Sequence, residues 1–369
     1  MVEMKKDLVI TFLIGNGFDL GLGLKTRFKD FYIKYLKDIS TNKNILEFKK
    51  EIAGNIESWS DFEYQLGQYS KNFDENNWRN FLDSKENFEN AFFEYLKNEQ
   101  EKIIYDKNQI IAYFYNAFNI QNLTNHIPAI FTDFLEEEIE NSDMLIYKFI
   151  NFNYTNTLEK IIGIIKGHQN ELARLHRGDN DFDSNNPLFY SIQHVHGSLK
   201  DLNCLIGVDN KAQIANESLT DIADILEYML KPEMNKVLQT GNEERAKQAM
   251  VESDIIFTYG LSLGVTDNRW WIELIENATK MGKKIIFFIH DDNLKINNVR
   301  QEIEQKNKYL TKLAQIIEQE QPYLKDYNDN IGFVFNKDIF AFNLTETVES
   351  YLKETNMHKL IQNTTKNAG

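Results

Sequence analysis

The stretch "LVITFLIGNGFDLGLGLKT", residues 8–26, joins an apolar run to two closely spaced glycines and an acidic residue. Residues 7–14 are apolar or β-branched almost throughout, and this pattern predicts a strand that is buried on both faces. Residues 26–39 then place aromatic and aliphatic side chains at helical spacing, with Thr26 as the expected N-cap. A buried strand, a glycine turn and a helix predict the first unit of a parallel α/β sheet.

Strand and helix patterns alternate again in the second half of the chain. Two helices are expected within residues 217–252, and helices also follow most of the expected strands. Those strands are predicted at 145–155, 189–199, 202–208, 254–264, 283–292 and 332–336. Continuous apolar strands that alternate with helices predict the α/β class, with a Rossmann-like parallel sheet flanked by helices.

Residues 44–144 interrupt this alternation with a helical, aromatic-rich pattern that is nearly free of strand signals. One apolar face per helix predicts a large all-α insertion after the first strand-helix unit. Residues 1–43 and 145–369 are then expected to form the Rossmann-like nucleotide-binding core.

The composition excludes several classes of protein. The chain has 369 residues and a net charge of −15, so a basic surface for nucleic-acid binding is not expected. A single cysteine, Cys204, excludes an internal disulfide framework and a cysteine-based zinc ribbon. No apolar run is long enough to cross a bilayer, and the first residues lack the apolar segment of a signal peptide. We therefore expect a cytoplasmic protein without a membrane partner.

Four of the expected strands end in glycine-rich or polar clusters. In open parallel sheets, ligands bind at the carboxyl ends of the strands, beside a switch in strand order. If the strands share one direction, the four clusters meet at one edge of the sheet. The clusters are Gly15-Asn16-Gly17-Phe18-Asp19, Asn153-Tyr154-Thr155, His196-Gly197-Ser198 and Gly260-Leu261-Ser262-Leu263.

The first three clusters each allow a functional and a structural interpretation. The amides of residues 15–17 can cradle a phosphate at the start of a helix, or the glycines can simply make a tight turn. Asp19 would repel a phosphate and fits better beside a ribose hydroxyl or a polar catalytic group. His196 is either a titratable group at the sheet edge or a hydrogen-bonded core histidine. Asn153 can hold a water or sugar hydroxyl, or form an Asx turn.

The fourth cluster, Asp267 and Glu63 also allow both a functional and a structural interpretation. Gly260 and Ser262 can contact a phosphate or ribose, or can form a plain turn. Asp267 is either a ligand contact or a helix N-cap. Glu63, one helical turn after Trp59, can reach over the site as an acid or base, or can belong to a solvated helix face.

Other motifs give weaker signals. His194 and His196 share a strand face, but no neighbouring motif supplies further metal ligands, and an isolated pair favours a structural role. The stretch His290-Asp291-Asp292 ends another expected strand and is a secondary candidate for the site. The sequence has neither a Walker-type phosphate loop nor a Gly-x-Ser-x-Gly elbow, which argues against P-loop NTPases and α/β-hydrolases.

Five segments between residues 14 and 271 together resemble the AbiH family of bacterial abortive-infection proteins. In chain order they are "IGNGFDLGLGLKTRFKDF", "WSDFE", "FNYTNTLE", "HVHGSL" and "YGLSLGVTDNRWW". This resemblance implies a role in defence against bacteriophage. A phage-derived protein trigger and a homo-oligomer are the protein partners that we consider.

A more distant likeness is to sirtuins and sirtuin-like antiphage NADases. Their Gly-x-Gly turn, Asn, His-Gly and late Gly-Thr-Ser-Leu turn match residues 15–17, 153, 196–197 and 260–263 in the same order. The likeness implies that NAD lies across the sheet, with Asn153 and His196 beside the nicotinamide ribose. Thr155 stands where those relatives carry Asp, and the single cysteine excludes the sirtuin zinc module.

The expected reaction is hydrolysis of NAD, an adenine dinucleotide, to nicotinamide and ADP-ribose, without a metal. His196 would be the catalytic base and Asn153 its catalytic partner. A non-catalytic nucleotide sensor is the alternative that Thr155 favours, whereas a nuclease or nucleotidyl effector is disfavoured by the acidic balance. The expected ligand-binding residues are Gly15, Asn16, Gly17, Phe18, Asp19, Thr155, Gly197, Gly260, Ser262, Leu263 and Asp267.

Overall fold

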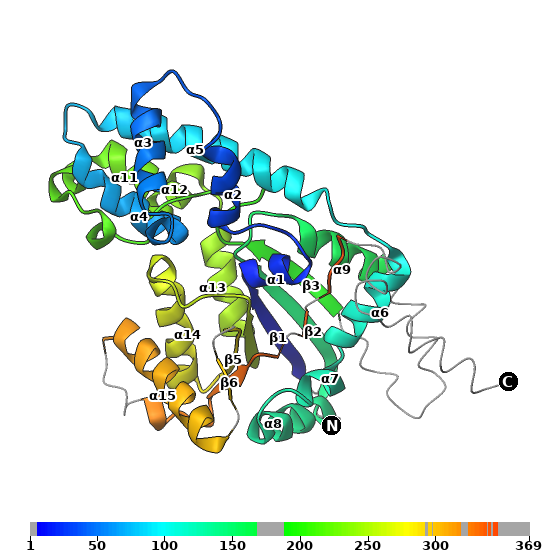
Figure 1. Cartoon of the computed structure of the whole chain (residues 1–369). Coiled ribbons are helices and arrows are strands. Elements are labelled where there is room, and N and C mark those ends of the chain that lie inside the picture. Colours follow the sequence, from blue (N-terminus) through cyan, green and yellow to red (C-terminus); the bar gives the residue numbers. More distant parts are fainter. Residues whose placement is uncertain are drawn as a thin grey trace.

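The computed structural model describes residues 6–167, 188–291, 294–296, 298–318, 324–337, 339–340 and 342–345. Within these residues six parallel strands form one sheet in the order β3-β2-β1-β4-β5-β6 (Figure 1). The order reverses between β1 and β4, as in doubly wound dinucleotide-binding folds. The predicted Rossmann-like α/β class is therefore confirmed. The strands are β1 (Lys6–Ile14), β2 (Ser142–Asn151), β3 (Leu188–His194), β4 (Ile255–Tyr259), β5 (Lys284–Ile289) and β6 (Ile331–Phe335).

The register aligns the carboxyl ends of the central strands. Ile14 at the end of β1 pairs with Asn151 on one side and with Tyr259 on the other, and Asn151 pairs with His194 at the end of β3. β1 is buried from Leu8 to its end, as its continuous apolar run predicts. The loops that follow these four strands therefore leave the sheet at the same edge.

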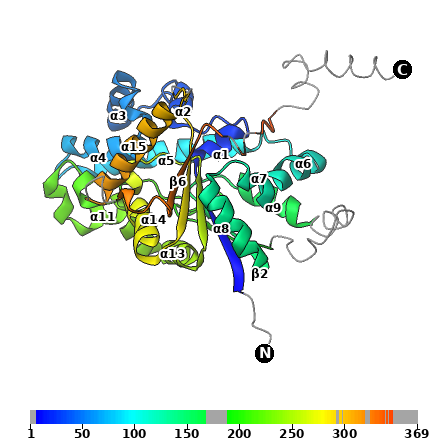
Figure 2. The same cartoon turned by 90° about the horizontal axis from the view of Figure 1, so that it is seen from below.

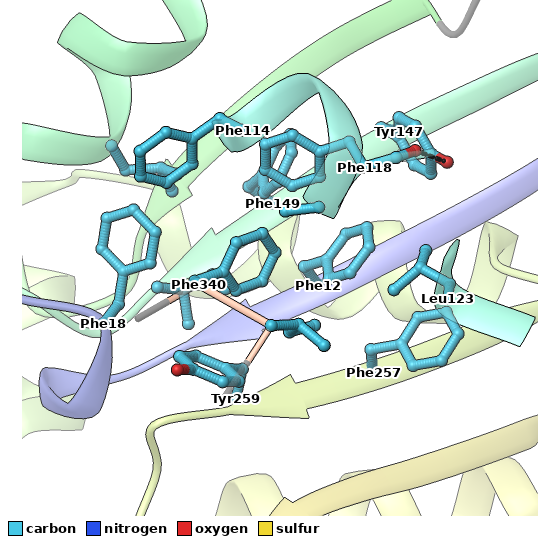
Figure 3. Close-up of a cluster of buried hydrophobic side chains, with 14 of the residues drawn as sticks. Phe12, Phe18, Phe114, Phe118, Leu123, Tyr147, Phe149, Phe257, Tyr259 and Phe340 are labelled. Carbon is cyan, nitrogen blue, oxygen red and sulfur yellow. Dashed lines mark hydrogen bonds between the residues drawn. The ribbon is translucent and has the colours of Figure 1, made fainter. Parts of the chain in front are cut away.

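Helices cover both faces of the sheet (Figures 1 and 2). On one face, Phe12 lies at the centre of a group of aromatic rings that includes Phe149 and Phe257, with ring centroids 5.6 and 5.2 Å away (Figure 3). The helices on this face are α6 (Lys107–Ala117), α7 (Ile120–Thr124), α8 (Ala129–Glu140) and α9 (Thr157–Gly167). On the other face lie α13 (Asn242–Glu252), α14 (Asn268–Met281) and α15 (Val299–Ile316).

A separate group of helices, which we call the helical lobe, packs beyond the carboxyl ends of the strands (Figure 1). Its aromatic core includes Phe62 and Phe88, whose rings stack with centroids 3.7 Å apart. Of the described helices, none combines the length and hydrophobicity that crossing a bilayer requires. The lobe consists of α2 (Phe28–Tyr35), α3 (Lys43–Gly54), α4 (Phe62–Tyr69), α5 (Trp78–Gln100), α11 (Ala223–Met229) and α12 (Lys231–Leu238).

The predicted insertion at 44–144 does not pack as one unit. Its first helices, α3 to α5, join α2 and α11 in the helical lobe, whereas α6 to α8 pack on the sheet. Both α2 and α11 lie outside the predicted insertion. Helical periodicity identifies the apolar face of each helix but not the surface that this face will cover, which explains the difference.

Several local predictions also differ from the structure. Residues 202–208 form no strand, because Ile206 and Val208 are buried in the lobe and Val208 makes only an isolated bridge to Leu230. Residues 217–252 contain three α-helices instead of two, since only one residue separates α11 from α12, which begins at Lys231 with Pro232 in its first turn. Thr26 does not cap α2, because its hydroxyl donates to Asn16 Oδ1 at 2.5 Å.

The two glycine turns at the centre of the sheet touch through their backbones. α1 (Asn16–Gly21) begins directly after β1, so the first turn is itself helical. The Gly17 amide donates to the Gly260 carbonyl at 2.8 Å, and a Cβ on Gly17 would lie 2.4 Å from Gly260 Cα. Gly260 also has a φ of 68°, which favours glycine. Both glycines are therefore required by close packing of the β1 and β4 turns.

We expect Gly17→Ala to lower the free energy of unfolding by about 1–3 kcal/mol, because the added methyl group must displace the backbone at Gly260. Gly163→Ala on α9 is the matched control: its Cβ would meet no atom within 4 Å, and alanine has the higher helix propensity. Urea unfolding of both variants measures the difference. Equal stability of the two variants would contradict the packing role of Gly17.

Candidate functional site

A cavity of about 550 Å³ opens at the carboxyl ends of β1, β2 and β4. The sheet side of its wall comes from the loops after these strands and from His196 after β3, and the opposite side comes from the helical lobe. The cavity lies beside the β1–β4 boundary, where the strand order reverses. Lining residues from the lobe and the segment before it are Thr26, Arg27, Phe28, Lys29, Glu57, Ser60, Asp61, Glu63, Phe92 and Leu96.

All four predicted strand-end clusters contribute to this region, but not every predicted residue reaches the cavity. Phe18 packs in the apolar core on one face of the sheet, and Leu263 belongs to the core on the other face. Gly197 has a φ of 74° and forms the turn after His196. The predicted residues that line the cavity are Asn16, Asp19, Asn153, Thr155, His196, Gly260, Ser262 and Asp267; Gly15, Gly17, Phe18, Gly197 and Leu263 are not in its wall.

Two of the three amides expected to cradle a phosphate, those of Gly15 and Gly17, are already used in hydrogen bonds within the protein. The Gly15 amide donates to the Tyr259 carbonyl at 2.9 Å, and the Gly17 amide donates to Gly260 at 2.8 Å. The amide of Phe18, the next residue, donates to the Gly15 carbonyl. Because each amide has one hydrogen, the Gly15, Gly17 and Phe18 amides, which already donate, cannot also hold a phosphate.

His196 is buried in the wall of the cavity with a defined ring orientation. Its Nε2 lies 3.1 Å from Asp267 Oδ1, while Nδ1 is buried and receives no hydrogen bond from any described residue. Burial and the Lys231 charge lower the pKa of His196 to about 4, so the ring is neutral near neutral pH. Burial opposes ionisation of Asp267, but Lys231 and His196 outweigh it and hold the pKa of this carboxyl well below its ordinary value.

These protonation states define the tautomer of His196. An ionised Asp267 carboxylate accepts hydrogen bonds but cannot donate one. The hydrogen of the neutral ring must therefore lie on Nε2, which leaves a lone pair on Nδ1. The arrangement is a carboxylate–imidazole pair whose second ring nitrogen can accept a proton.

Lys231 is a component of the site that the sequence did not reveal. It is fully buried, and its Nζ lies 2.6 Å from Glu63 Oε2 and 3.2 Å from Asp267 Oδ1. Burial lowers the pKa of Lys231, but these two carboxylates more than compensate and raise it. Burial raises the pKa of Glu63 to about 7 despite the lysine. A lysine at the start of an ordinary amphipathic helix carries no signal that separates it from a surface residue.

Asp19 lies beside Thr155 and Thr157 and accepts a hydrogen bond from each. Thr155 Oγ1 donates to Asp19 Oδ2 at 2.5 Å, and Thr157 Oγ1 donates to Asp19 Oδ1 at 2.6 Å. Burial raises the pKa of Asp19 to about 6. The carboxylate therefore comes from the helix after β1 and is held in place by the loop after β2.

Asn153 and His194 fasten the loop after β2. The Asn153 side chain donates from Nδ2 to the Gly15 carbonyl at 3.1 Å, and Asn151, not Asn153, makes the Asx-type contact, accepting from the Asn153 amide. His194 Nδ1 lies 2.8 Å from the Asn153 carbonyl oxygen, and its Nε2 contacts Glu159. His194 thus has a different environment from His196. Among the described residues, no group of three or more His, Cys, Asp and Glu side chains is arranged to hold a metal ion.

The charges around the cavity are unevenly distributed. Arg27 and Lys29 are exposed cations in its wall. The carboxylates in the wall are Asp19, Glu57, Asp61, Glu63 and Asp267. His290 and Asp291, the secondary candidates after β5, do not line this cavity, and Asp292 lies outside the described residues. The wall therefore offers cations for an anionic part of a ligand and carboxylates for a cationic or hydroxyl-bearing part.

The family model described as "Bacteriophage abortive infection AbiH" matches residues 11–290 of the chain. The match covers well over half of the sequence and includes every residue that lines the cavity. A comparison with curated proteins found no match.

The raised pKa of Asp19 predicts a pH-dependent stability difference between the native chain and Asp19→Asn. Because the folded-state pKa of about 6 exceeds the ordinary 3.8, the native chain gains stability from the protonated group at low pH and loses it as the pH rises through 6. From about pH 5 to pH 7 the native chain should lose about 1 kcal/mol relative to Asp19→Asn. Urea unfolding at both values measures this change, and a difference that does not vary with pH would contradict it.

Proposed function

The chain belongs to the AbiH family of bacteriophage abortive-infection proteins, and we propose that it binds NAD in the cavity and hydrolyses it to nicotinamide and ADP-ribose. The observation that carries this proposal is the buried His196 in the cavity wall: Asp267 fixes its Nε2, and no described residue occupies Nδ1. A buried polar atom without a partner requires an explanation, and a catalytic role is one such explanation.

The position and size of the cavity support a dinucleotide ligand. Doubly wound sheets with the order found here bind dinucleotides at the carboxyl edge, where the strand order reverses. The cavity opens at this point, and its volume of about 550 Å³ is typical of small-molecule sites.

The charges in the wall suggest how NAD is oriented. We assign the pyrophosphate to Arg27 and Lys29, because the amides of both glycines in the first turn are already used. Asp19 is assigned to a ribose hydroxyl, one of the two roles expected for it from the sequence. The cationic nicotinamide end then lies towards Glu63 and Asp267, whose carboxylates would stabilise the positive charge of an oxocarbenium-like transition state.

In the proposed reaction, water forms a bond to the anomeric carbon of the nicotinamide ribose. The carbon–nitrogen bond breaks, and its electron pair leaves with nicotinamide, which departs as a neutral molecule. His196 Nδ1 accepts the proton of the water, and Asp267 stabilises the imidazolium that forms. Asn153, in the same wall, is assigned the position of the water or of a ribose hydroxyl.

A sensor that binds a nucleotide without cleaving it is the competing proposal. It is favoured by Thr155, which has no carboxylate and whose hydroxyl is engaged by Asp19. Binding of ADP-ribose together with the absence of nicotinamide release would support the sensor. Nicotinamide release that depends on His196 would support the enzyme.

We expect His196→Ala to reduce nicotinamide release from NAD by roughly 10²- to 10⁴-fold, because the variant lacks the proton acceptor. His126→Ala is the matched control, since His126 is exposed and does not line the cavity. Mass spectrometry of released nicotinamide measures turnover, and calorimetric titration with ADP-ribose tests that the variant still binds. Undiminished release by His196→Ala would exclude this mechanism.

The assignment of the pyrophosphate predicts the effect of removing Arg27. Loss of a charged hydrogen bond typically removes about 1.5–3 kcal/mol, so Arg27→Ala should weaken ADP-ribose binding by roughly 10- to 100-fold. Lys34→Ala on the same helical segment is the control, because Lys34 is exposed outside the cavity. Calorimetric titration of both variants measures the affinities. Equal affinities would place the phosphates elsewhere.

A further inference from the structure

We propose that Lys231 is a positioning residue that orients Asp267 and thereby keeps His196 Nδ1 as a hydrogen-bond acceptor. Calling Nδ1 the proton acceptor of a reaction rests on the proposed function. The effect of Lys231 on the protonation of the imidazole does not depend on the proposed function, so it can be tested separately.

Hydrogen bonds hold both the backbone and the ammonium group of Lys231. Its backbone amide donates to the Val208 carbonyl at 3.0 Å, which joins the start of α12 to the segment at Val208. Its ammonium group has three hydrogens, and three oxygens surround it: Glu63 Oε2 at 2.6 Å, Asp267 Oδ1 at 3.2 Å and the Thr266 carbonyl at 3.4 Å. A fully buried cation with three acceptors has little freedom to move.

Lys231 and His196 bind the same atom. Asp267 Oδ1 lies 3.2 Å from Lys231 Nζ and 3.1 Å from His196 Nε2. The Asp267 side chain makes no hydrogen bond that caps α14, so helix capping does not set its orientation. These two contacts orient the carboxylate, and the lysine charge keeps it ionised although it lies in a buried site.

The charged groups around His196 change its pKa in opposite directions, and removing the lysine changes their balance. Asp267, directly before α14, raises the pKa of His196, whereas Lys231 on α12 and Arg269 on α14 lower it. Glu63 on α4 pairs with Lys231 and is not among the described residues that hydrogen-bond to the ring. Without the lysine, Asp267 would pair with a protonated imidazole, and Nδ1 would then carry a hydrogen.

A purely structural role for Lys231 makes a different prediction. If the lysine only joins the helical lobe to the sheet, its loss would lower stability without changing the protonation of His196. The state of the imidazole distinguishes the two roles, because it reports the local charge and not the stability of the fold.

The experiment uses the full chain with ¹⁵N-labelled histidine and two-bond ¹H–¹⁵N correlation spectra, in which His196 is assigned by comparison with His196→Ala. We expect the native ring to remain neutral with its hydrogen on Nε2 from about pH 5 to pH 8. In Lys231→Met the ring should titrate within this range, with both nitrogens protonated at its acidic end. Lys231→Arg should restore the native pattern, and Glu63→Gln, which leaves the Lys231–Asp267 contact, should retain it.

A ring that stays neutral in Lys231→Met throughout this range would overturn the proposal. If Lys231→Met does not fold because Glu63 is left unpaired, the double variant Lys231→Met with Glu63→Gln removes both charges and is read in the same way. Where the native chain releases nicotinamide, the acidic limb of its pH–rate profile should move to higher pH in Lys231→Met. Altered imidazole titration without any NAD hydrolysis by the native chain would retain the role of Lys231 and reject the proposed reaction.

Discussion

The direct backbone contact between the β1 and β4 turns is the constraint on which the site depends. Gly17 donates to Gly260, and no side chain separates the two turns. Asn153 then joins the loop after β2 to the same place by donating to the Gly15 carbonyl. Three loops from distant parts of the chain are thereby held against one another at the point where the strand order reverses. This contact therefore places the turns after β1, β2 and β4 side by side in the cavity wall.

The second organising feature is the way the chain keeps charged groups buried. Lys231 has no exposed surface, yet it is stable there because Glu63 and Asp267 approach it from different elements. Such a cluster destabilises the fold when one partner is missing, because a charge is then buried without a counter-ion. When it is complete, it favours one arrangement of the elements that carry its members. It also connects the helical lobe to the sheet, because Glu63 belongs to α4 and Asp267 precedes α14. The same ion pairs therefore set the charges in the cavity wall and join the lobe to the sheet.

Sequence patterns were sufficient for the parts of the molecule that short segments determine. The buried apolar runs predicted the parallel sheet, and the strand ends predicted which loops meet around His196 and Asn153. The use of the Gly15 and Gly17 amides could not be predicted, because it depends on which strand lies beside β1. Lys231 was missed for a similar reason, since its two carboxylate partners are distant in sequence and only the folded chain shows that it is buried. Periodicity also could not divide the helices between the lobe and the sheet, because it does not identify the surface that each apolar face covers.

The wall of the cavity is assembled from segments that extend from Asn16 to Asp267. During synthesis the ribosome releases these segments in order, and the carboxylate that fixes the His196 ring emerges long after the ring itself. A nascent or prematurely terminated chain that lacks Asp267 therefore has a histidine without an oriented tautomer and a lysine without one of its two counter-ions. Whatever chemistry this cavity performs, the complete site cannot form until Asp267 has left the ribosome.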